Sequence, residues 1–303
     1  MDVSIIIVNY NTVSFLVGAI DSILAKTKNI EYEIIVVDNN SNDDSRTILS
    51  EKYDNKVIYL GLSENIGFGR ANNEAAKIAK GRNLFFLNPD TVLLNNAVKI
   101  LSDYLDNNHC VGCCGGNLVD VNNKPNISYL RVNIFSVFYE LNEICFKLLS
   151  KMKFGKNCYY NHTNKPMKVK CIIGADLMIR KEIFVKLYGF DPDFFMYHEE
   201  SELESRVIKM GYEIYNIPYA KIIHYEGKSF NNNKDKIRYD YLSRNMYIHK
   251  TYNKTIIIII NILYFIRIKI RLFIFIILRN KEKITLWSEI NKQKIYYLSK
   301  IYN

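Results

Sequence analysis

Polar side chains that could bind a charged ligand gather at four points in the first third of the chain. The four clusters are Asn9-Tyr10-Asn11, Asp38-Asn39-Asn40, the stretch from Asn65 to Asn73, and Asn88-Pro89-Asp90. A carboxylate such as Asp90, next to a rigid proline, can hold a divalent ion against a diphosphate. The carboxylate of Asp38 can accept a hydrogen bond from the imide N–H of a pyrimidine base. Each cluster alone is also common turn or helix-cap chemistry, so a site requires that they converge.

A further group of acids occurs later in the chain. Glu199, Glu200 and Glu202 fall in the first turn of a helix predicted over Glu199–Met210. The positive end of the helix dipole favours acids there, and this alone could explain them. Alternatively, one of them is a general base that removes the proton of an acceptor hydroxyl while a neighbour orients it. The apolar run Phe194-Phe195-Met196 beside the acids would then exclude water.

The elements that would position these groups alternate between strands and helices. Predicted strands cover Val3–Val8, Glu33–Val37, Val57–Leu60 and Leu84–Leu87, and predicted helices cover Val13–Leu24, Asp43–Lys52 and Gly69–Lys80. The strands are continuous apolar runs, as in a parallel sheet that helices cover on both faces. In such sheets ligands bind beyond the carboxyl ends of the strands, and all four polar clusters fall there. The chain is therefore predicted to be an α/β protein with a ligand site at one sheet edge.

The middle of the chain is less regular. Apolar runs predict strands at Val169–Ile173 and Leu177–Ile179, on either side of Gly174-Ala175-Asp176. We interpret the weakly patterned stretch Leu130–Lys170 as a loop over the acceptor. The six cysteines do not form the two close pairs of a zinc site. No signal peptide precedes the first predicted strand, so we expect reduced thiols in a cytoplasmic protein.

The net charge of +10 is unevenly distributed. From Lys228 to Asn303 there are 16 Lys and Arg against 4 acids, whereas the rest of the chain has 25 against 27. A near-neutral body is not the composition of a nucleic-acid-binding enzyme, and we expect no nucleic-acid partner. The basic residues of the tail are interspersed with Ile, Phe and Leu, which is typical of a membrane-surface anchor.

The order of these motifs resembles family 2 glycosyltransferases, in particular the branch that contains bacterial rhamnosyltransferases and related cell-surface polysaccharide enzymes. The resemblance spans roughly Met1 to Lys250. It rests on Val3 to Asn11, Val37 to Asp43, Asn65 to Asn73, Phe86 to Asp90, Gly174 to Arg180, Gly189 to Arg206, His224 to Ser229, and Arg244-Asn245. There are two departures: Asn88 stands where many relatives carry Asp, and Glu199-Glu200-Ser201-Glu202 replaces the commoner Glu-Asp-x-Asp.

The resemblance implies the type A glycosyltransferase fold, that of nucleotide-diphospho-sugar transferases, with a Rossmann-like and mostly parallel sheet. It also implies an inverting, metal-dependent transfer from a UDP- or dTDP-sugar, such as dTDP-rhamnose, to a lipid-linked or polysaccharide acceptor in capsule, O-antigen or cell-wall synthesis. Asp90 and His224 would bind Mn²⁺ or Mg²⁺, and Glu200 would be the catalytic base beside Glu199 and Glu202. The residues expected around the donor are Asn9, Asn11, Asp38, Asn40, Gly67, Asn72 and Asn88.

The expected domain organisation follows from the same division of the chain. Residues 1–230 would form the catalytic domain, with a nucleotide-sugar half (1–115) and an acceptor half (116–230). Residues 231–303 would form a helical tail that associates with an anionic membrane surface or with a second copy of the chain. Neither apolar piece of the tail, Ile256–Ile266 or Leu272–Leu278, reaches the ~20 residues of a spanning helix. We expect Arg267, Lys269 and Arg271 to snorkel from an in-plane or re-entrant segment at the inner face of the cell membrane.

Two other classes of protein remain open. A sugar-1-phosphate nucleotidyltransferase shares a related sheet but would carry a Gly-rich, Arg-containing loop after the first strand, where this chain has Asn9-Tyr10-Asn11-Thr12. A non-catalytic nucleotide-binding or membrane-binding module would not need Asp38, Asp90 and the acid cluster together.

Overall fold

The computed structural model describes residues 1–130, 159–225 and 233–302 of the 303-residue chain. Most of the predicted acceptor loop, residues 131–158, and the end of the His224 motif, residues 226–232, lie outside the described residues. The described chain divides into two compact units. The first holds 1–130, 159–195 and 199–225, and the second holds 196–198 and the C-terminal helices.

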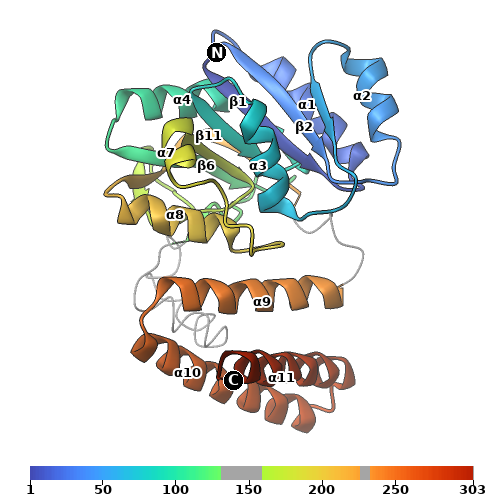
Figure 1. Cartoon of the computed structure of the whole chain (residues 1–303), viewed down its shortest axis with the longest axis vertical. Coiled ribbons are helices and arrows are strands. Elements are labelled where there is room, and N and C mark those ends of the chain that lie inside the picture. Colours follow the sequence, from blue (N-terminus) through green and yellow to red (C-terminus); the bar gives the residue numbers. More distant parts are fainter. Residues whose placement is uncertain (131–158, 226–232, 303) are drawn as a thin grey trace. The chain divides into compact units, whose positions relative to one another are not determined.

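A central sheet organises the first unit (Figure 1). Among the described residues nine strands pair in the order β3-β2-β1-β4-β10-β6-β11-β5, with β8 added on β11. Their bounds are β1 Val3–Asn9, β2 Tyr32–Asp38, β3 Ile58–Gly61, β4 Asn83–Leu87, β5 Thr91–Leu93, β6 Val111–Val119, β8 Met167–Val169, β10 Asp176–Arg180 and β11 Glu213–His224. Strands β3, β2, β1 and β4 are parallel, whereas β10 runs antiparallel to both β4 and β6. Two short strands, β7 (Tyr129–Leu130) and β9 (Cys171–Ile172), pair with each other.

Helices cover both faces of this sheet because its inner strands are apolar on both sides. In β1, Ile5 and Ile7 join one buried cluster, with α1 (Val13–Lys26), α2 (Ser45–Tyr53) and α4 (Ala97–Asn107). The alternate residues Ile6 and Val8 join a second cluster, with α3 (Phe68–Ile78), α7 (Lys181–Lys186) and α8 (Glu199–Lys209). The period of two along the strand thus assigns each side chain to one helical layer.

The predicted elements of the first ninety residues are confirmed, with helix ends shifted by a few residues. The predicted strand Val169–Ile173 is in fact two, β8 and β9, with Lys170 between them. Strands β6 and β11, at the centre of the second half of the sheet, are not apparent from the sequence. Strand β6 contains Gly115-Gly116, a pattern that disfavours a strand, but a Cβ at Gly116 would press against the backbone of Ala220 in β11.

The second unit consists mainly of three helices, α9 (Asn233–Thr251), α10 (Lys254–Ile277) and α11 (Lys281–Tyr302). The side chain of Asn253 accepts a hydrogen bond from the amide of Ile256 and so caps α10, and Asn280 accepts from Lys283 at the start of α11. Helix α10 runs without a break through Arg267, Lys269 and Arg271. The two predicted apolar pieces of the tail are therefore parts of one helix.

The expected positions of the tail arginines are wrong. The guanidinium carbon of Arg267 lies 5.6 Å, and that of Arg271 5.2 Å, from the ring centroid of Trp287 in α11. Arg267 also lies over Tyr264, at 5.8 Å. Both cations thus pack on aromatic rings in the contact between two helices, where cation–π attraction holds them, and they do not extend outward.

Candidate functional site

The loops after β1 and β2 are joined by a network of short polar side chains. In the sheet register Asn9 is the partner of Asp38, so the two strands end side by side. The side-chain amide nitrogen of Asn9 donates to Ser41 Oγ at 3.0 Å, and the side-chain oxygen of Asn9 accepts from Thr12 Oγ1 at 2.8 Å. Asn9 is fully buried, so its side chain holds the two loops together from beneath.

Asn11 and Asn40 lie at the exposed surface of these loops. Both have left-handed backbone conformations, with φ of 55° and 63°, which asparagine adopts more readily than most residues. Asn11 Oδ1 accepts a hydrogen bond from the backbone N–H of Asn42 at 2.7 Å, and the backbone N–H of Asn11 donates to Ser41 Oγ. These two predicted donor-binding residues therefore frame an open polar rim above the carboxyl ends of β1 and β2.

Asp38 is buried just below that rim. Its carboxylate accepts hydrogen bonds from the Ser41 amide at 3.1 Å and from the Tyr59 hydroxyl at 2.7 Å. Burial, together with the hydrogen bond to Asp38, raises the pKa of Tyr59 to about 12, so the phenol stays protonated and keeps donating. Ser45 Oγ lies 3.3 Å from the same carboxylate. A carboxylate accepts about four hydrogen bonds, so room remains for one more donor.

Asn39 connects the end of β2 to the loop before α3. Its amide donates to Asn65 Oδ1 at 2.9 Å and its oxygen accepts from the Ile66 amide at 3.0 Å. Gly67 follows with φ of +88°, and a Cβ there would overlap the carbonyl oxygen of Phe195. The Phe68 amide donates to that same carbonyl at 2.9 Å. Gly67 thus lets the start of α3 approach the backbone that leads into the acid cluster.

Asn72 lies one turn into α3 and is buried. Its amide donates to Phe68 O at 3.0 Å, while its Oδ1 has no hydrogen-bond partner in the described structure.

Asp90 and His224 come together at the end of the sheet although they lie far apart in the sequence. Strand β11 pairs with β5 so that His224 is opposite Thr91, and the Tyr225 amide donates to Asp90 O at 3.0 Å. The Nε2 atom of His224 lies 3.5 Å from Asp90 Oδ1. Asp90 is 3% exposed, and Oδ1 lacks a hydrogen bond in the described structure. A buried carboxylate oxygen without a hydrogen bond is a ligand that suits Mn²⁺ or Mg²⁺, and the neighbouring imidazole could add a nitrogen ligand.

Asn88 links the aspartate motif to the acid cluster. The backbone N–H of Asn88 donates to Ala175 O at 3.0 Å, which fixes the Gly174-Ala175 turn beside the end of β4. A Cβ at Gly174 would lie 3.4 Å from Cγ of Glu200, so this turn is in contact with the glutamate side chain. The aspartate motif, the glycine turn and Glu200 are therefore consecutive neighbours in one region.

The three glutamates of α8 have different surroundings. Glu202 forms an ion pair with Arg206, whose Nη2 lies 2.7 Å from Glu202 Oε2 and which also donates to Gly189 O at 2.8 Å. Glu199 is 4% exposed, and burial, with the nearby charge of Glu200, raises its pKa well above the usual value. Glu200 is half-buried against Gly174. Of the three, Glu200 combines partial access to solvent with a position next to the aspartate motif.

Two further acids lie beneath this region, and neither was assigned a role from the sequence. Asp176 and Glu204 are both fully buried, and burial raises both pKa values well above the usual range. Asp176 accepts from the Gly116 amide at 2.6 Å, and Glu204 accepts from the Ile172 amide at 2.8 Å. Burial therefore favours the neutral form of both acids, and their hydrogen bonds join backbone segments under the site.

The segment Met196–His198 enters the acid helix with strained backbone. Tyr197 and His198 have φ of 70° and 64°, a region that costs about 1 kcal/mol or more for such residues. This segment belongs to the second unit, where Ser243 Oγ of α9 donates to Met196 O at 2.6 Å and His198 Nε2 lies 3.4 Å from Asp240. Contacts with α9 therefore hold the strained turn. The sequence gives no context to His198 because its partner lies on a helix far along the chain.

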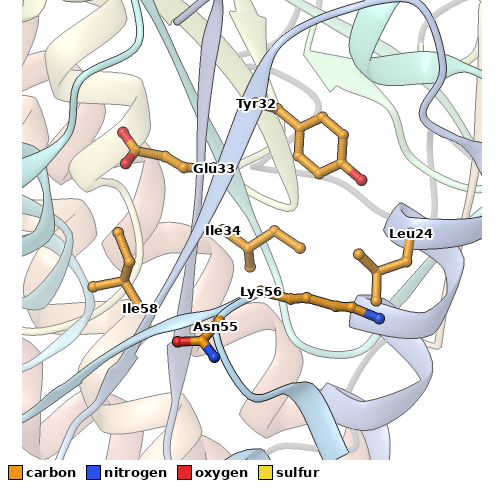
Figure 2. A pocket seen from close by; sticks show the side chains of 7 residues that line it. All are labelled: Leu24, Tyr32, Glu33, Ile34, Asn55, Lys56 and Ile58. Atoms are coloured by element: carbon orange, nitrogen blue, oxygen red, sulfur yellow. The ribbon is translucent and has the colours of Figure 1, made fainter.

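A hollow of about 300 Å³ lies at the opposite ends of the strands and is not part of this region. Figure 2 shows Tyr32, Glu33 and Ile34 of β2 with Leu24 of α1 and Asn55, Lys56 and Ile58 around it. The carboxylate of Glu33 and the ammonium of Lys56 point in opposite directions (Figure 2). Glu33 is bonded within the fold, to Ser4 Oγ and the Lys80 amide. Without converging polar groups this hollow does not suggest a substrate site.

Comparisons with known proteins agree with this geometry. Residues 4–185 match the family model described as glycosyl transferase family 2, so the chain belongs to that family. An uncharacterized glycosyltransferase of Rickettsia prowazekii is 36% identical over 168 residues, which is 51% of this chain and 52% of that protein. The beta-1,3-glucosyltransferase WfaP of Escherichia coli, which uses UDP-Glc and alpha-D-GlcNAc-diphosphoundecaprenol according to its name, is 40% identical over 89 residues. The match covers 29% of this chain and 35% of WfaP, and the chain spans about half the length of the first relative.

The fold has solved counterparts. The structure of GalNAc-T7 with UDP, GalNAc and Mn²⁺ superimposes with a TM-score of 0.58 at 16% identity, covering 82% of this chain and 50% of that one. The predicted type A glycosyltransferase fold is confirmed.

Proposed function

We propose that the chain is an inverting, metal-dependent glycosyltransferase that moves a sugar from a nucleotide diphosphate to a hydroxyl of a growing glycan. The observation that carries this proposal is the pairing of Asp90 with His224. A buried carboxylate oxygen without a hydrogen-bond partner lies 3.5 Å from an imidazole nitrogen, at the sheet edge where ligands bind in α/β folds.

The donor would lie across the carboxyl ends of β1, β2 and β4. Asp38 would accept a hydrogen bond from the imide N–H of uracil or thymine, a base edge that cytosine and adenine do not present. The rim formed by Asn11 and Asn40 would contact the rest of the nucleoside. Asn9, Gly67, Asn72 and Asn88 would act mainly by holding the loops in place, since each is engaged with the surrounding chain.

Asp90 and His224 would hold a divalent ion together with the diphosphate oxygens. Mn²⁺ and Mg²⁺ commonly bind through one or two protein groups and substrate phosphates. Such an ion would neutralise negative charge on the leaving nucleoside diphosphate. The residues present fit this role because Asp90 Oδ1 is already desolvated and oriented toward the imidazole.

Glu200 would be the general base. Its carboxylate would take the proton of the acceptor hydroxyl while the hydroxyl oxygen attacks the anomeric carbon from the face opposite the diphosphate. The new carbon–oxygen bond forms as the bond to the β-phosphate oxygen breaks, and the electron pair leaves with the nucleoside diphosphate. Glu199, kept neutral by burial, would not compete for that proton. Phe194, buried next to the acids, would help exclude water.

The proposed substrates follow from the same chemistry and from relatives. UDP- and dTDP-sugars suit Asp38, and dTDP-rhamnose is included because of the family branch that the motifs resemble. A lipid-linked or polysaccharide acceptor of capsule, O-antigen or cell-wall synthesis is proposed from the name of the WfaP relative, which includes a diphosphoundecaprenol acceptor. The proposal includes no nucleic-acid partner.

The experiment is a binding and hydrolysis screen across nucleotide sugars, with and without Mn²⁺. For the preferred donor, calorimetry should show Mn²⁺-dependent binding that Asp90→Asn abolishes and His224→Ala weakens. The matched control is Asp103→Asn, a surface acid paired with Lys99 on α4, which should bind the donor as the wild type does.

Two results would count against the proposal. Equal donor affinity of wild type and Asp90→Asn in saturating Mn²⁺ would remove the metal role. Full turnover of the wild type in EDTA would also remove the metal role, although the chain would still be a glycosyltransferase.

A further inference from the structure

One side of α10 exposes an unusually large apolar surface. Eleven large apolar side chains between Ile256 and Leu278 are 38% to 66% exposed in the described structure. Ile258, Ile262, Ile266, Ile270, Phe273 and Ile276 follow one another at spacings of three and four, and Phe265 lies three residues after Ile262, so these side chains lie on one side of the helix. We call this side the apolar face of α10. A helix of this length extends for about 36 Å, and the face runs along all of it.

The opposite side of α10 packs against its neighbours. Tyr264, Ile268 and Phe275 are buried in a cluster with Trp287 of α11 and Tyr241 of α9. Arg267 and Arg271 lie on this inner side, over Trp287. The helix therefore turns two of its three central cations inward and presents Ile and Phe outward, the reverse of an ordinary surface helix.

Exposed cations border the apolar face. Lys269 lies within it, with its ammonium 5.1 Å from the ring centroid of Phe265. Lys254 is exposed at the start of α10, and Arg279 is exposed just beyond its end. Glu282 is the one acid between Lys254 and Lys283. The surface therefore combines a long apolar stripe with a surplus of positive charge.

We infer that the apolar face of α10 docks in the plane of an anionic lipid leaflet. Its apolar side chains would enter the boundary between headgroups and acyl chains, and Lys254 and Lys269 would meet lipid phosphates. A symmetric pair of chains joined through this face is disfavoured, because each copy would bring the same positive charges into contact. Within the described part of the chain, no helix combines the length and apolar character needed to cross a membrane. The inference does not depend on the proposed sugar transfer.

The test is sedimentation of the full chain with vesicles of phosphatidylglycerol and phosphatidylcholine, compared with vesicles of phosphatidylcholine alone. Phe273→Asp and Ile262→Asp should each lower partitioning onto the anionic vesicles by about tenfold or more. Each variant places a charge where the wild type would bury an apolar side chain in the bilayer. Lys269→Glu should lower binding to anionic vesicles by about fivefold or more and leave binding to neutral vesicles unchanged. Added salt should release part of the bound protein from anionic vesicles.

The matched control is Val185→Asp on α7, where an apolar side chain is 58% exposed in the first unit. It should bind vesicles as the wild type does. Because Trp287 lies beneath α10 and is the chain's single tryptophan, an unchanged emission maximum in Phe273→Asp shows that the helices still pack.

Three outcomes would overturn the inference. If both Phe273→Asp and Ile262→Asp partitioned onto vesicles as the wild type does, the apolar face of α10 would be excluded as the lipid-binding surface. Equal binding to neutral and anionic vesicles would exclude the role of charge. A wild-type chain that ignores vesicles but forms a dimer in analytical ultracentrifugation, dissociated by Phe273→Asp, would show that a second copy covers this face.

Discussion

Three glutamates in one turn of α8 share a chemical type but not an environment, and that difference determines which of them can act. Glu202 is held by Arg206, and burial raises the pKa of Glu199 well above its usual value. Glu200 lies against the Gly174 turn, which the Asn88 amide ties to the aspartate motif. The sequence predicted the cluster but could not rank its members, because the ranking depends on burial and on partners that the fold supplies.

Glu200→Gln should therefore lower turnover by ~10²-fold or more while leaving donor affinity nearly unchanged, because the variant keeps its shape but cannot accept a proton. Single-turnover rates and calorimetric donor binding measure the two quantities separately. Glu202→Gln is the matched control: its main effect should be a lower melting temperature, because Arg206 loses its charged partner. If Glu199→Gln were the variant that lost turnover and Glu200→Gln kept it, the base would be misassigned.

Glu204 supplies a pH dependence of stability at the same scale. Burial raises its pKa in the fold above the unfolded value. The folded chain then binds more protons than the unfolded chain, so the stabilising contribution is complete below about pH 4.3 and is lost as pH rises through the folded pKa. Glu204→Gln mimics the neutral acid, so it should remove a slope of at most about 1.4 kcal/mol per pH unit.

The measurement is the free energy of unfolding by urea at several pH values between about 3 and about 8. The free energy of unfolding of Glu204→Gln should rise relative to that of the wild type as pH rises. Glu213→Gln is the control of opposite sign, because the hydrogen bond from Lys168 lowers the pKa of Glu213. Glu213 stabilises the wild type above its unfolded pKa, and this stabilisation is lost as pH falls, so the difference in unfolding free energy between wild type and Glu213→Gln should shrink at acidic pH. Parallel curves for wild type and Glu204→Gln across this range would mean that Glu204 does not titrate there.

At the scale of elements, the predictable part of the fold is the part whose pattern is local. Strands β1, β2 and β4 are continuous apolar runs, and the helices between them have regular apolar stripes. Strand β6 was not predictable, because its Gly115-Gly116 pair is explained by contacts with β9 and β11 far along the chain. The pairing of Asp90 with His224 depends on the antiparallel contact of β5 with β11, which no local pattern encodes. His224 was therefore accessible only through the family resemblance.

Gly67 shows how an element start can be fixed by one close approach. Gly67→Ala should destabilise the chain by about 3 kcal/mol or more, because its backbone is in a region that only glycine adopts freely and a Cβ would overlap the Phe195 carbonyl. The matched substitution is Gly18→Ala in α1, where a Cβ meets nothing within 4 Å. That change should stabilise the chain by up to about 1 kcal/mol through higher helix propensity. Urea unfolding measures both, and equal effects of the two substitutions would show that the contact at Gly67 is not tight.

At the scale of the whole molecule, the two units differ in how much apolar surface they bury. The first unit has a large cluster on each face of its sheet. The described part of the second has two small ones, around Trp287 and around Ile248. Less buried surface means a smaller free energy of unfolding, so the helical unit should unfold at a lower denaturant concentration than the sheet.

The single tryptophan makes this difference measurable. Trp287 is 9% exposed within the helical unit, so its emission should shift to longer wavelength when that unit alone unfolds. Circular dichroism of the full chain should then show two transitions, the first coinciding with the fluorescence change and the second without one. Trp287→Phe should remove the fluorescence signal and move only the first dichroism transition to lower denaturant, since the guanidinium groups of Arg267 and Arg271 lose their best aromatic partner. One transition seen identically by both probes would instead show that the two units unfold together, as one cooperative structure.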